Sequence, residues 1–383
     1  MNIAMFSDTY VPHKNGVVSA ILLEKSELEK RGHTVYIISV GTVQKDDADS
    51  VIRMRSVPAP LLKSKQPFRI GIYDRTKIKK FFQTYEIDIV HTHTEFSVGW
   101  IGYHLARKYH IPHIHTFHTM WEDYKNVYFL TRVIVPFNLV RTAMRRFLTY
   151  PNLITTPTQK AADYIAKLVP DSTITILQNG IPFTPLQNTD RNLLRAKFNL
   201  PTNAIIALFT GRISDEKRIL QLYRVYKLAM LHNSSLYLLL AGDGGRLKEL
   251  QKTIQEDGLE ERVRSLGFVS LEVVNELNAL ADITTTASLS ETSNMSLLEG
   301  ISSGLAVIAR NDLCLSGVVE DYVNGVLCKD ELEMVEQLLY LCENPKILDT
   351  YRRNNLQLAS QFTAQKHTDT LLNLYEETLE LLI

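Results

Sequence analysis

Short apolar runs alternate with longer amphipathic stretches along most of the chain. The apolar runs are rich in β-branched residues and predict buried strands, whereas apolar spacings of three and four residues between them predict helices. In the first half the predicted strands are Ile3–Ser7, Thr34–Ser39, Ile87–His91, His113–Phe117, Leu153–Thr156 and Ile174–Leu177. The helices predicted between them include Val18–Arg31, Thr76–Tyr85, Val98–Tyr109 and Ala161–Leu168. Such alternation favours a parallel sheet with helices on both faces.

The alternation restarts after Asn179–Asp190, a stretch with Gly180, Pro182 and Pro185 that is typical of a linker. The later strands are predicted at Ile205–Thr210, Leu236–Ala241, Val263–Leu266, Ile283–Thr286, Ala306–Ala309 and Val326–Cys328. We therefore expect an α/β protein with two doubly wound parallel-sheet domains that face a central cleft, where ligands of such sheets bind. The predicted organisation is a first domain at 1–180, a linker at 181–190, a second domain at 191–363, and a C-terminal helix at 364–383 that packs back on the first domain.

Composition supports two ordinary globular domains: the chain has 383 residues, of which 45% are apolar and 22% charged. The net charge of zero hides an asymmetry. Residues 1–185 carry 23 Lys and Arg against 15 Asp and Glu, a charge of +8, while residues 186–383 carry 19 against 27, a charge of −8. Different charges on the two halves indicate different partners. The neutral total, without any dedicated motif, argues against a nucleic-acid partner.

Cysteine usage and hydropathy bear on location. The chain has three cysteines, Cys314, Cys328 and Cys342, an odd count without metal or redox spacing that suits a reducing cytoplasm. Residues 1–11 predict a strand rather than a signal peptide, and no stretch of 18 apolar residues is present. We expect a cytoplasmic protein that lies at most on a membrane surface.

The most informative segment for chemistry runs from Ser288 to Gly300, between two predicted strands. Ser293 or Asn294 is suited to cap a helix that begins near Met295, and the free amides of such a helix start can bind a diphosphate. Glu291 would then lie in the loop beside the ligand, and Glu299 one turn into the helix. The alternative is a capped helix with a solvated glutamate.

Two further turns follow strands of the same domain. Gly211 permits an unusual turn, and Arg212 and Lys217 after it can place two positive charges over a pair of phosphates. Gly242 and Gly244 after the next strand can bring backbone close to a nucleotide. The alternatives are a strand–turn–helix with exposed basic residues, and a glycine-rich turn without ligand.

The first domain offers a loop and a group of histidines. Gly16, next to Val17, could let backbone approach a phosphate or sugar at a helix start, although a flexible loop is the alternative. His91 and His93 share a strand face at metal-like spacing, but no HExxH motif and no evident carboxylate accompanies them, so we expect no metal. His118 ends a strand, where a ligand contact is expected. The alternative is a buried histidine paired with Glu95.

Two basic segments are candidates for contact with a membrane. Residues 63–80 contain Lys63, Lys65 and Arg69 among seven basic residues. Residues 127–150 mix apolar side chains with Arg132, Arg141, Arg145 and Arg146. Apolar and cationic residues on one helix are attracted to an anionic bilayer. The alternative is a helix that packs its apolar face on the core and exposes its basic face to water.

Taken together, these residues resemble the GT-B retaining glycosyltransferases with an E-x7-E motif. Glu291 and Glu299 have that spacing, and Gly211-Arg212 with Glu216-Lys217 resembles the G-R-x-x-x-E-K segment of the family. Within the family, the segments at 6–18, 91–99 and 115–124 look like those of bacterial diacylglycerol glucosyltransferases. Where those relatives carry glycine, this chain has Asn294, which tolerates a left-handed backbone.

The resemblance implies a hexosyl transfer, with UDP-glucose as donor, diacylglycerol as acceptor and binding to the inner membrane face. It implies that Glu291 binds sugar hydroxyls, Glu299 the ribose, and His118 the donor sugar. The backbone near Gly16 and Val17 would approach the phosphates, and the helix start would bind them through the segment Ser293, Asn294, Met295 and Ser296. With Arg212 and Lys217 neutralising the phosphate charge, no metal and no cofactor besides the UDP-sugar donor is expected.

Two alternatives to this function remain open at the level of sequence. One is a transferase that acts on a polysaccharide, a teichoic acid or a glycosylated protein. The other is a glycosyltransferase-like subunit that has lost catalysis and acts as a binding partner. The donor sugar and the oligomeric state are not fixed by these residues.

Overall fold

The computed structural model describes residues 1–13, 15–58, 69–120, 137–182, 185–186 and 189–381. The chain divides into two compact units. The first contains Met1–Pro182 and Ala364–Ile383, and the second contains Phe183–Thr363. The C-terminal segment therefore belongs to the first unit, although the whole second unit precedes it in the sequence.

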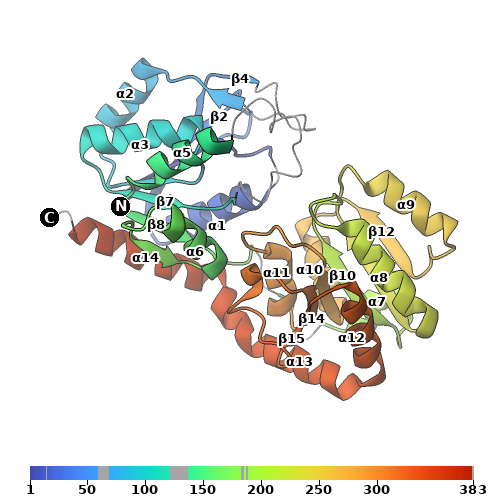
Figure 1. Cartoon of the computed structure of the whole chain (residues 1–383). Helices are drawn as coiled ribbons and strands as arrows, with labels where there is room; N and C mark the ends of the chain where they lie inside the picture. The colour runs from blue at the N-terminus through green and yellow to red at the C-terminus, as the bar shows by residue number, and fades with distance from the viewer. Residues whose placement is uncertain (14, 59–68, 121–136, 183–184, 187–188, 382–383) are drawn as a thin grey trace. The chain divides into compact units, whose positions relative to one another are not determined.

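Each unit is built on one main parallel sheet (Figure 1). The first sheet has the order β3-β2-β1-β6-β7-β8-β9 and the second the order β12-β11-β10-β13-β14-β15. The strands of the first sheet are β1 Asn2–Ser7, β2 Thr34–Val40, β3 Val51–Met54, β6 Ile89–Thr92, β7 His113–Thr116, β8 Leu153–Thr156 and β9 Ile174–Ile176. Those of the second are β10 Ile205–Thr210, β11 Leu236–Ala241, β12 Val263–Gly267, β13 Ile283–Thr286, β14 Ala306–Arg310 and β15 Gly325–Cys328. Parallel pairing requires a crossover between neighbours, and helices supply most of these connections.

Helices cover both faces of each sheet, which makes both units doubly wound. Those of the first unit are α1 Gly16–Lys30, α2 Arg75–Thr84, α3 Ser97–Tyr109, α5 Phe137–Leu148, α6 Gln159–Leu168 and α14 Ala364–Glu380. Those of the second are α7 Arg191–Lys197, α8 Ile219–His232, α9 Leu247–Glu256, α10 Leu271–Leu280, α11 Met295–Ser302, α12 Glu331–Glu343 and α13 Pro345–Leu358. The short pair β4 Ser56–Pro58 and β5 Arg69–Gly71 and the 3-10 turns Leu313–Leu315 and Ala359–Phe362 complete the described elements.

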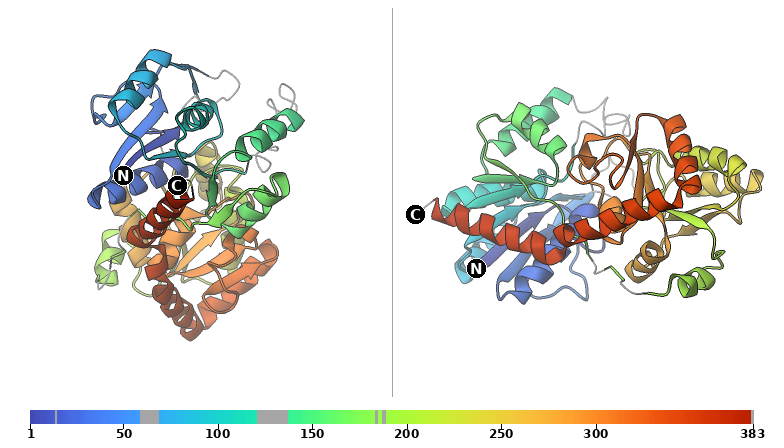
Figure 2. Two further views of the ribbon diagram at one scale, coloured as in Figure 1. Left: turned by 90° about the vertical axis from the view of Figure 1, so that its left-hand side faces the viewer. Right: turned by 90° about the horizontal axis from the view of Figure 1, so that it is seen from below.

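The last helix, α14, packs on the first sheet beside α1. Leu371, Leu374 and Tyr375 lie in one apolar cluster with Ile21 and Leu28 of α1. In Figure 2 this helix, in dark red, lies next to the blue N-terminal elements of the same unit. Burial of side chains of this size stabilises a fold by about 1.5–3 kcal/mol each, so α14 is an integral part of the first core.

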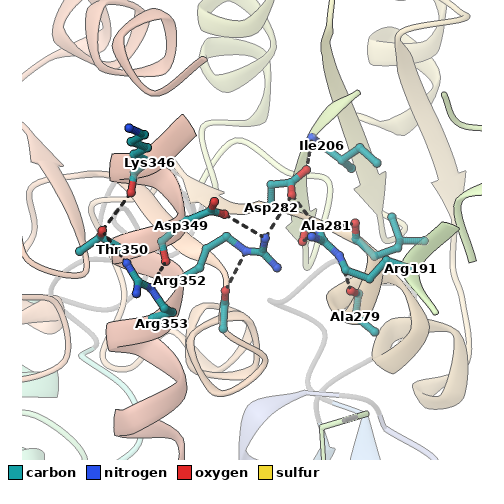
Figure 3. Close-up of polar contacts among 12 residues, drawn as sticks. Arg191, Ile206, Ala279, Ala281, Asp282, Lys346, Asp349, Thr350, Arg352 and Arg353 are labelled. Carbon is teal, nitrogen blue, oxygen red and sulfur yellow. Dashed lines mark hydrogen bonds and ion pairs between the residues drawn. The ribbon is translucent and has the colours of Figure 1, made fainter. Parts of the chain in front are cut away.

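A buried carboxylate organises the amino-terminal end of the central strands of the second sheet (Figure 3). Asp282, which precedes β13, accepts hydrogen bonds from Arg191 Nη2 at 2.7 Å, Arg195 Nη2 at 3.0 Å and the Ile206 amide at 2.9 Å. Arg191 also donates to three carbonyl groups at the end of α10. A third guanidinium, of Arg352, lies 3.6 Å from the same carboxylate. Asp282 thus connects α7, α13 and β10, and Arg191 extends these contacts to the end of α10.

The predicted strands and helices agree closely with the structure. Strands β8, β10, β11 and β13 have the predicted bounds, and most other boundaries differ by one or two residues. The prediction omitted β3, β4 and β5, which are short, and β3 has polar Arg53 among its four residues. Two doubly wound parallel-sheet units therefore form the fold, as the alternation of elements predicts.

Candidate active site

The order of strands reverses between β1 and β6 in the first sheet and between β10 and β13 in the second. Ligands of open parallel sheets bind at the carboxyl ends of the strands at such a reversal, because the adjacent crossovers diverge there. The loops that follow β10 and β13 carry the segments 211–218 and 287–294. The predicted Arg212, Lys217 and Glu291 all lie in these two loops, and Glu299 lies in the helix that follows the second.

Lys217 and Glu291 meet although 74 positions separate them in the sequence. The ammonium of Lys217 donates to Oε1 of Glu291, and both side chains are mostly buried. The hydroxyl groups of Ser288 and Ser290 lie 3.4 and 3.3 Å from the carbonyl oxygen of Glu216, so that the two loops are held together. A cation and a carboxylate are thereby fixed side by side at the strand reversal.

Arg212 does not join this pair. Its guanidinium pairs with Glu216, four residues along, and the side chain is 57% exposed. The sequence predicted two positive charges over one pair of phosphates, whereas the structure gives each cation a separate carboxylate partner. Lys217 is the more deeply placed of the two cations, with 21% of its side chain exposed.

The glycines after β10 and β11 bring two loops into backbone contact. A Cβ on Gly242 would lie 1.8 Å from the carbonyl oxygen of Gly211, and one on Gly244 would lie 2.3 Å from that of Ile213. Gly211 and Gly242 also have positive φ values, of 144° and 156°. Amides of Gly211 and Ile213 donate to the facing loop. The glycine pattern therefore packs one strand-end loop on its neighbour, a role that the sequence reasoning did not assign.

Gly16 differs from these glycines and offers a matched comparison. A Cβ on Gly16 would meet no atom within 4 Å, and its φ is not in the left-handed region. Gly16→Ala is therefore expected to keep or raise the melting temperature, as alanine is favoured over glycine in a helix by about 0.5–1 kcal/mol. If the Gly16 backbone approaches a phosphate, the same variant lowers kcat/KM for the donor by roughly tenfold or more, equivalent to about 1.4 kcal/mol.

The matched variant Gly242→Ala is expected to show the opposite balance, because its added methyl overlaps with the backbone of Gly211. Gly242→Ala should lower the melting temperature, whatever its effect on the donor kinetics. Unchanged donor kinetics in Gly16→Ala would remove Gly16 from the candidate site.

The start of α11 confirms one local prediction and corrects another. Asn294 caps the helix, and its Oδ1 accepts from the Leu297 amide at 3.1 Å and from the Ser296 hydroxyl at 2.9 Å. Its φ of −97° is not left-handed, so the tolerance of asparagine for that conformation is not used. Within the described chain, the Met295 and Ser296 amides have no hydrogen-bond partner. They and the dipole of the helix make this end attractive to an anion.

Glu299 lies in α11, on the turn that packs against β13. The next residue, Gly300, allows this packing, because a Cβ there would overlap with the side chain of Thr284. The Glu299 side chain is partly buried and has no carboxylate hydrogen bond among the described residues. Burial raises the pKa of Glu299 to about 7. A carboxylate that has lost hydration without gaining a protein partner is well suited to accept hydrogen bonds from a ligand.

The loop after β1 contains a structural carboxylate that the sequence reasoning missed. Asp8 accepts from the Val98 amide at 2.9 Å and the Thr94 hydroxyl at 2.7 Å, and from the hydroxyl of Ser97. Burial raises the pKa of Asp8, although these hydrogen bonds oppose the rise. The carboxylate thus occupies the N-terminus of α3. Gly16 and Val17 begin α1, where Asn15 is the cap and accepts from the Val18 amide at 3.0 Å.

The histidines form a buried polar cluster in the first unit. His91 and His93 do share a strand face, with ring centroids 4.0 Å apart. Glu24 of α1 lies beside them, and their ligand atoms and its carboxylate are within 4.8 Å of one another. No carboxylate near these histidines is evident from the sequence, because Glu24 is 67 positions away from His91. Both ring nitrogens of His91 already bond to hydroxyl groups, of Tyr375 and Thr116, at 2.7 Å.

His118 lies just beyond β7 and is half-buried. Its Nε2 is 3.1 Å from Nδ1 of His93, and the two rings are stacked. Burial lowers the pKa of His118 to about 3, so the ring is neutral at physiological pH. The sequence offered Glu95 as the partner of His118, but Oε1 of Glu95 lies 3.2 Å from Nε2 of His115.

The structure describes only some of the residues that are predicted to contact a membrane. Lys63, Lys65 and Arg132 lie outside the described residues. Arg69 is used within β4–β5, where it donates to the hydroxyl and the carbonyl of Ser56. Arg141, Arg145 and Arg146 are exposed on α5.

On the other face of α5, Met144, Phe147 and Leu148 are buried in the core, which agrees with the alternative of a core-facing helix with a basic outer face. Across the described ranges, none of the helices combines the length and the apolar character needed to cross a bilayer.

Comparison with known families defines the class of protein. A model described as Glycosyltransferase Family 4 matches residues 14–184, and one described as Glycosyl transferases group 1 matches residues 190–357. The two matches correspond to the two sheet-containing halves of the chain. Fold and family matches together define a GT-B glycosyltransferase.

Two curated relatives carry the same name, Alpha-monoglucosyldiacylglycerol synthase. That of Streptococcus pneumoniae (strain ATCC BAA-255 / R6) is 30% identical over 348 residues, which cover 88% of this chain and 78% of the relative. That of Acholeplasma laidlawii is 28% identical over 393 residues, which cover 99% and 98%. The chain belongs to the glycosyltransferase family of these synthases.

Solved structures support the fold over the full length. Sucrose-phosphate synthase from Thermosynechococcus elongatus superposes with a TM-score of 0.79 at 18% identity, covering 99% of each chain. Anabaena Alr3699/HepE in complex with UDP-glucose superposes with a TM-score of 0.72 at 18% identity, covering 98% of this chain and all of the other. At this level of identity the likeness shows the GT-B fold.

Proposed function

We propose that this glycosyltransferase moves glucose from UDP-glucose to diacylglycerol, with retention of the anomeric configuration and without a metal ion. The observation that carries the proposal is the Lys217–Glu291 pair beside the start of α11, at the strand reversal of the second sheet. The acceptor is taken from the two relatives, whose name states a monoglucosyldiacylglycerol product. A UDP-sugar donor is supported by the neighbour solved with UDP-glucose.

The donor would bind to the second unit through three kinds of group. The Met295 and Ser296 amides and the helix dipole of α11 face a diphosphate, and the Lys217 ammonium neutralises it. Glu299 accepts hydrogen bonds from the ribose hydroxyls, and Glu291 binds hydroxyl groups of the sugar. Positive charge from a lysine and a helix start does the work that a divalent cation does in other transferases.

The proposed reaction takes place on one face of the sugar. The bond from the anomeric carbon to the diphosphate breaks as the acceptor hydroxyl oxygen bonds to the same carbon on the same face. The departing phosphate oxygen takes the hydroxyl proton, so that UDP leaves and atoms and charge balance. The enzyme's contribution is to stabilise the negative charge on the leaving group. This charge is larger in the transition state than in the bound donor.

The exposed arginines of α5 support a membrane-bound acceptor. Arg141, Arg145 and Arg146 form a basic outer face over a buried apolar face, and exposed Leu139 lies on the same helix. Each basic side chain near an anionic bilayer contributes about 1 kcal/mol to binding. Diacylglycerol resides in such a surface, so the proposed location is peripheral, on the cytoplasmic face of the cell membrane.

The test is UDP release by the purified protein from UDP-glucose or UDP-galactose, with and without diacylglycerol in anionic micelles. We expect release with UDP-glucose only when the lipid is present, unchanged by EDTA, and a product whose anomeric proton coupling is that of the α-glucoside. Release with a soluble saccharide but not with lipid would contradict the acceptor. A β-linked product would contradict retention, and loss of activity in EDTA would contradict metal independence.

The raised pKa of Glu299 predicts a pH dependence of donor binding. If ribose hydroxyls bond to the ionised carboxylate, UDP affinity falls as pH drops below about 7. At pH 6 only about a tenth of the carboxyl groups would be ionised, so the dissociation constant should rise roughly tenfold from its value at pH 8. Calorimetric titration of UDP at the two pH values measures this, and Glu299→Gln should bind weakly at both.

The stability of the protein should change with pH in the direction opposite to UDP affinity. This contrast separates a ligand-binding role of Glu299 from a structural one. A carboxyl group whose pKa is raised on folding costs stability as pH rises from about 4.5 to 7, and the cost persists above that range. Glu299→Gln removes a cost of up to about 3 kcal/mol, so its melting temperature at pH 8 should exceed that of the parent protein. Tighter UDP binding in this variant would contradict the assignment of Glu299.

A further inference from the structure

A chain of buried polar side chains leads from the C-terminal helix to His118. It runs from His367 of α14 to Glu24 of α1, then to His93 after β6 and His118 after β7. His367, Glu24 and His93 are 5%, 1% and 1% exposed. The transfer proposed above gives Glu24 and His93 no role, although burial of a charged and a polar side chain at this depth is costly without a partner.

The first link shows which oxygen of Glu24 is free to accept a hydrogen bond. Nδ1 of His367 is 2.7 Å from the carbonyl oxygen of Gln178, and since a carbonyl only accepts, Nδ1 carries a proton. Nε2 of His367 is 3.2 Å from Oε1 of Glu24. Burial opposes the charged form of His367, but the hydrogen bond and charge of Glu24 outweigh it and raise the pKa of His367. The contact between Nε2 of His367 and Oε1 of Glu24 then holds one proton, and whichever of the two atoms carries it, Oε2 of Glu24 is left as a bare acceptor.

The second link orients His93. Oε2 of Glu24 lies 3.6 Å from Nε2 of His93, and neither atom has a hydrogen-bond partner within the described part of the chain. Burial lowers the pKa of His93 well below its usual value, so the ring is neutral and has a single N–H. A carboxylate attracts an N–H and repels a nitrogen lone pair. The favoured tautomer therefore has its proton on Nε2, toward Glu24, and a lone pair on Nδ1.

The third link transmits this choice to His118. A hydrogen bond of 3.1 Å between Nδ1 of His93 and Nε2 of His118 needs one donor and one acceptor. With the lone pair on His93, the proton must be on Nε2 of His118. The neutral His118 ring then has a lone pair on Nδ1, and among the described residues no protein group bonds to that atom.

We propose that Glu24 and His93 are positioning residues that hold His118 in the tautomer with a bare Nδ1, so that His118 accepts a hydrogen bond from a hydroxyl group of the donor sugar. The substrate part of this statement rests on the proposed function, whereas the tautomer does not. A hydroxyl can both donate and accept, but fluorine or an ether oxygen in its place can only accept. His118 in this form therefore selects for a free sugar hydroxyl and against a substituted one.

The test of the tautomer is nitrogen-15 NMR of the histidine rings in the full-length protein, with His118→Asn and His93→Asn used for assignment. We expect a protonated Nε2 and an unprotonated Nδ1 on both His93 and His118. Glu24→Gln can turn an amide N–H toward His93 Nε2, and this should reverse the protonated nitrogen on both rings. Glu29→Gln on the same helix, where the glutamate is 41% exposed, is the matched control and should change neither ring.

The kinetic test uses UDP-glucose analogues in which one sugar hydroxyl at a time is replaced by fluorine. When fluorine replaces the hydroxyl group that faces His118, kcat/KM of the parent protein should fall roughly tenfold, the effect expected from the loss of one hydrogen bond. Glu24→Gln should lose this discrimination, because its His118 would present an N–H that fluorine can accept. Glu29→Gln should keep it.

Two results would overturn the proposal. One is a proton on Nδ1 of His118 in the parent protein, which is decisive even if no sugar is transferred or Glu24→Gln fails to fold. The other is a stoichiometric metal ion that is retained through purification and lost in Glu24→Gln. Glu24, His91 and His93 could hold such an ion. A metal on Nε2 of His93 would put the proton of His93 on Nδ1 and so reverse the donor and the acceptor in its hydrogen bond with His118. Elemental analysis therefore precedes the NMR experiment.

Discussion

Lys217→Ala is expected to lower kcat about 100- to 1000-fold while changing the KM for UDP-glucose little. Preorganised charge at a developing oxyanion contributes effects of this size, and an interaction that strengthens in the transition state appears in kcat. Lys217 is suited to this role because it is mostly buried and is held by Glu291 at the strand reversal. The measurement is steady-state UDP release with the lipid acceptor at saturation.

A surface lysine of the same unit provides the control. Lys252 on α9 is 75% exposed and lies 3.5 Å from Glu256, so Lys252→Ala should leave kcat and KM unchanged. If Lys217→Ala instead raises KM at constant kcat, the ammonium contributes only to ground-state binding of the donor. A kcat within a factor of two of the parent value would remove Lys217 from the catalytic machinery.

Asp282→Asn is expected to destabilise the second unit by about 3–5 kcal/mol, because removal of one partner leaves buried charges uncompensated. Arg191 and Arg195 both donate to this carboxylate, which is 6% exposed. Since two units are present, unfolding need not be a single transition. Hydrogen exchange at the amides of β13 and α7 measures the effect where it should be largest.

Asp349→Asn is the matched control for this variant (Figure 3). Asp349 lies 3.8 Å from Arg352 and is 66% exposed, so its loss should change stability by less than about 0.5 kcal/mol. The proposed donor site lies at the other end of the β13 strand, so UDP binding at a temperature well below the transition should be unchanged in both variants. Equal melting curves for Asp282→Asn and the parent would show that the arginines do not depend on this carboxylate.

Local patterns predicted the elements well, because each depends on a few consecutive residues. Leu153–Thr156 and Ile205–Thr210 are short buried runs bounded by polar or turn residues, and their strands have the predicted bounds. The cap of α11 was narrowed to Ser293 or Asn294, and Asn294 is the cap. The carboxyl end of a parallel strand also fixes where loops must gather. That is why Lys217 and Glu291, predicted separately, are found in contact.

Interactions between residues distant in sequence were not predictable from the same patterns. Glu24 is an acidic residue in a helix with several others, and only the packing of α1 and α14 on the sheet shows that it faces His91, His93 and His367. Asp8 is likewise a loop residue in the sequence, and in the structure its carboxylate accepts from the Val98 amide at the start of α3. The sequence also shows no sign that Glu216 pairs with Arg212, and the placement of Arg212 and Lys217 over a pair of phosphates stays a prediction.

The return of α14 to the first unit has a consequence for synthesis on the ribosome. The apolar surface of α1 around Ile21 and Leu28 is translated before the second unit, but its partners Leu371 and Tyr375 are translated after that unit. The second unit is complete in sequence while the first still lacks a helix. A nascent chain must therefore keep an unfinished core, with Glu24 still without His367, in a soluble state until α14 has been translated. Premature termination shortly after residue 363 would leave that core permanently open, and such fragments are natural substrates for chaperones and proteases.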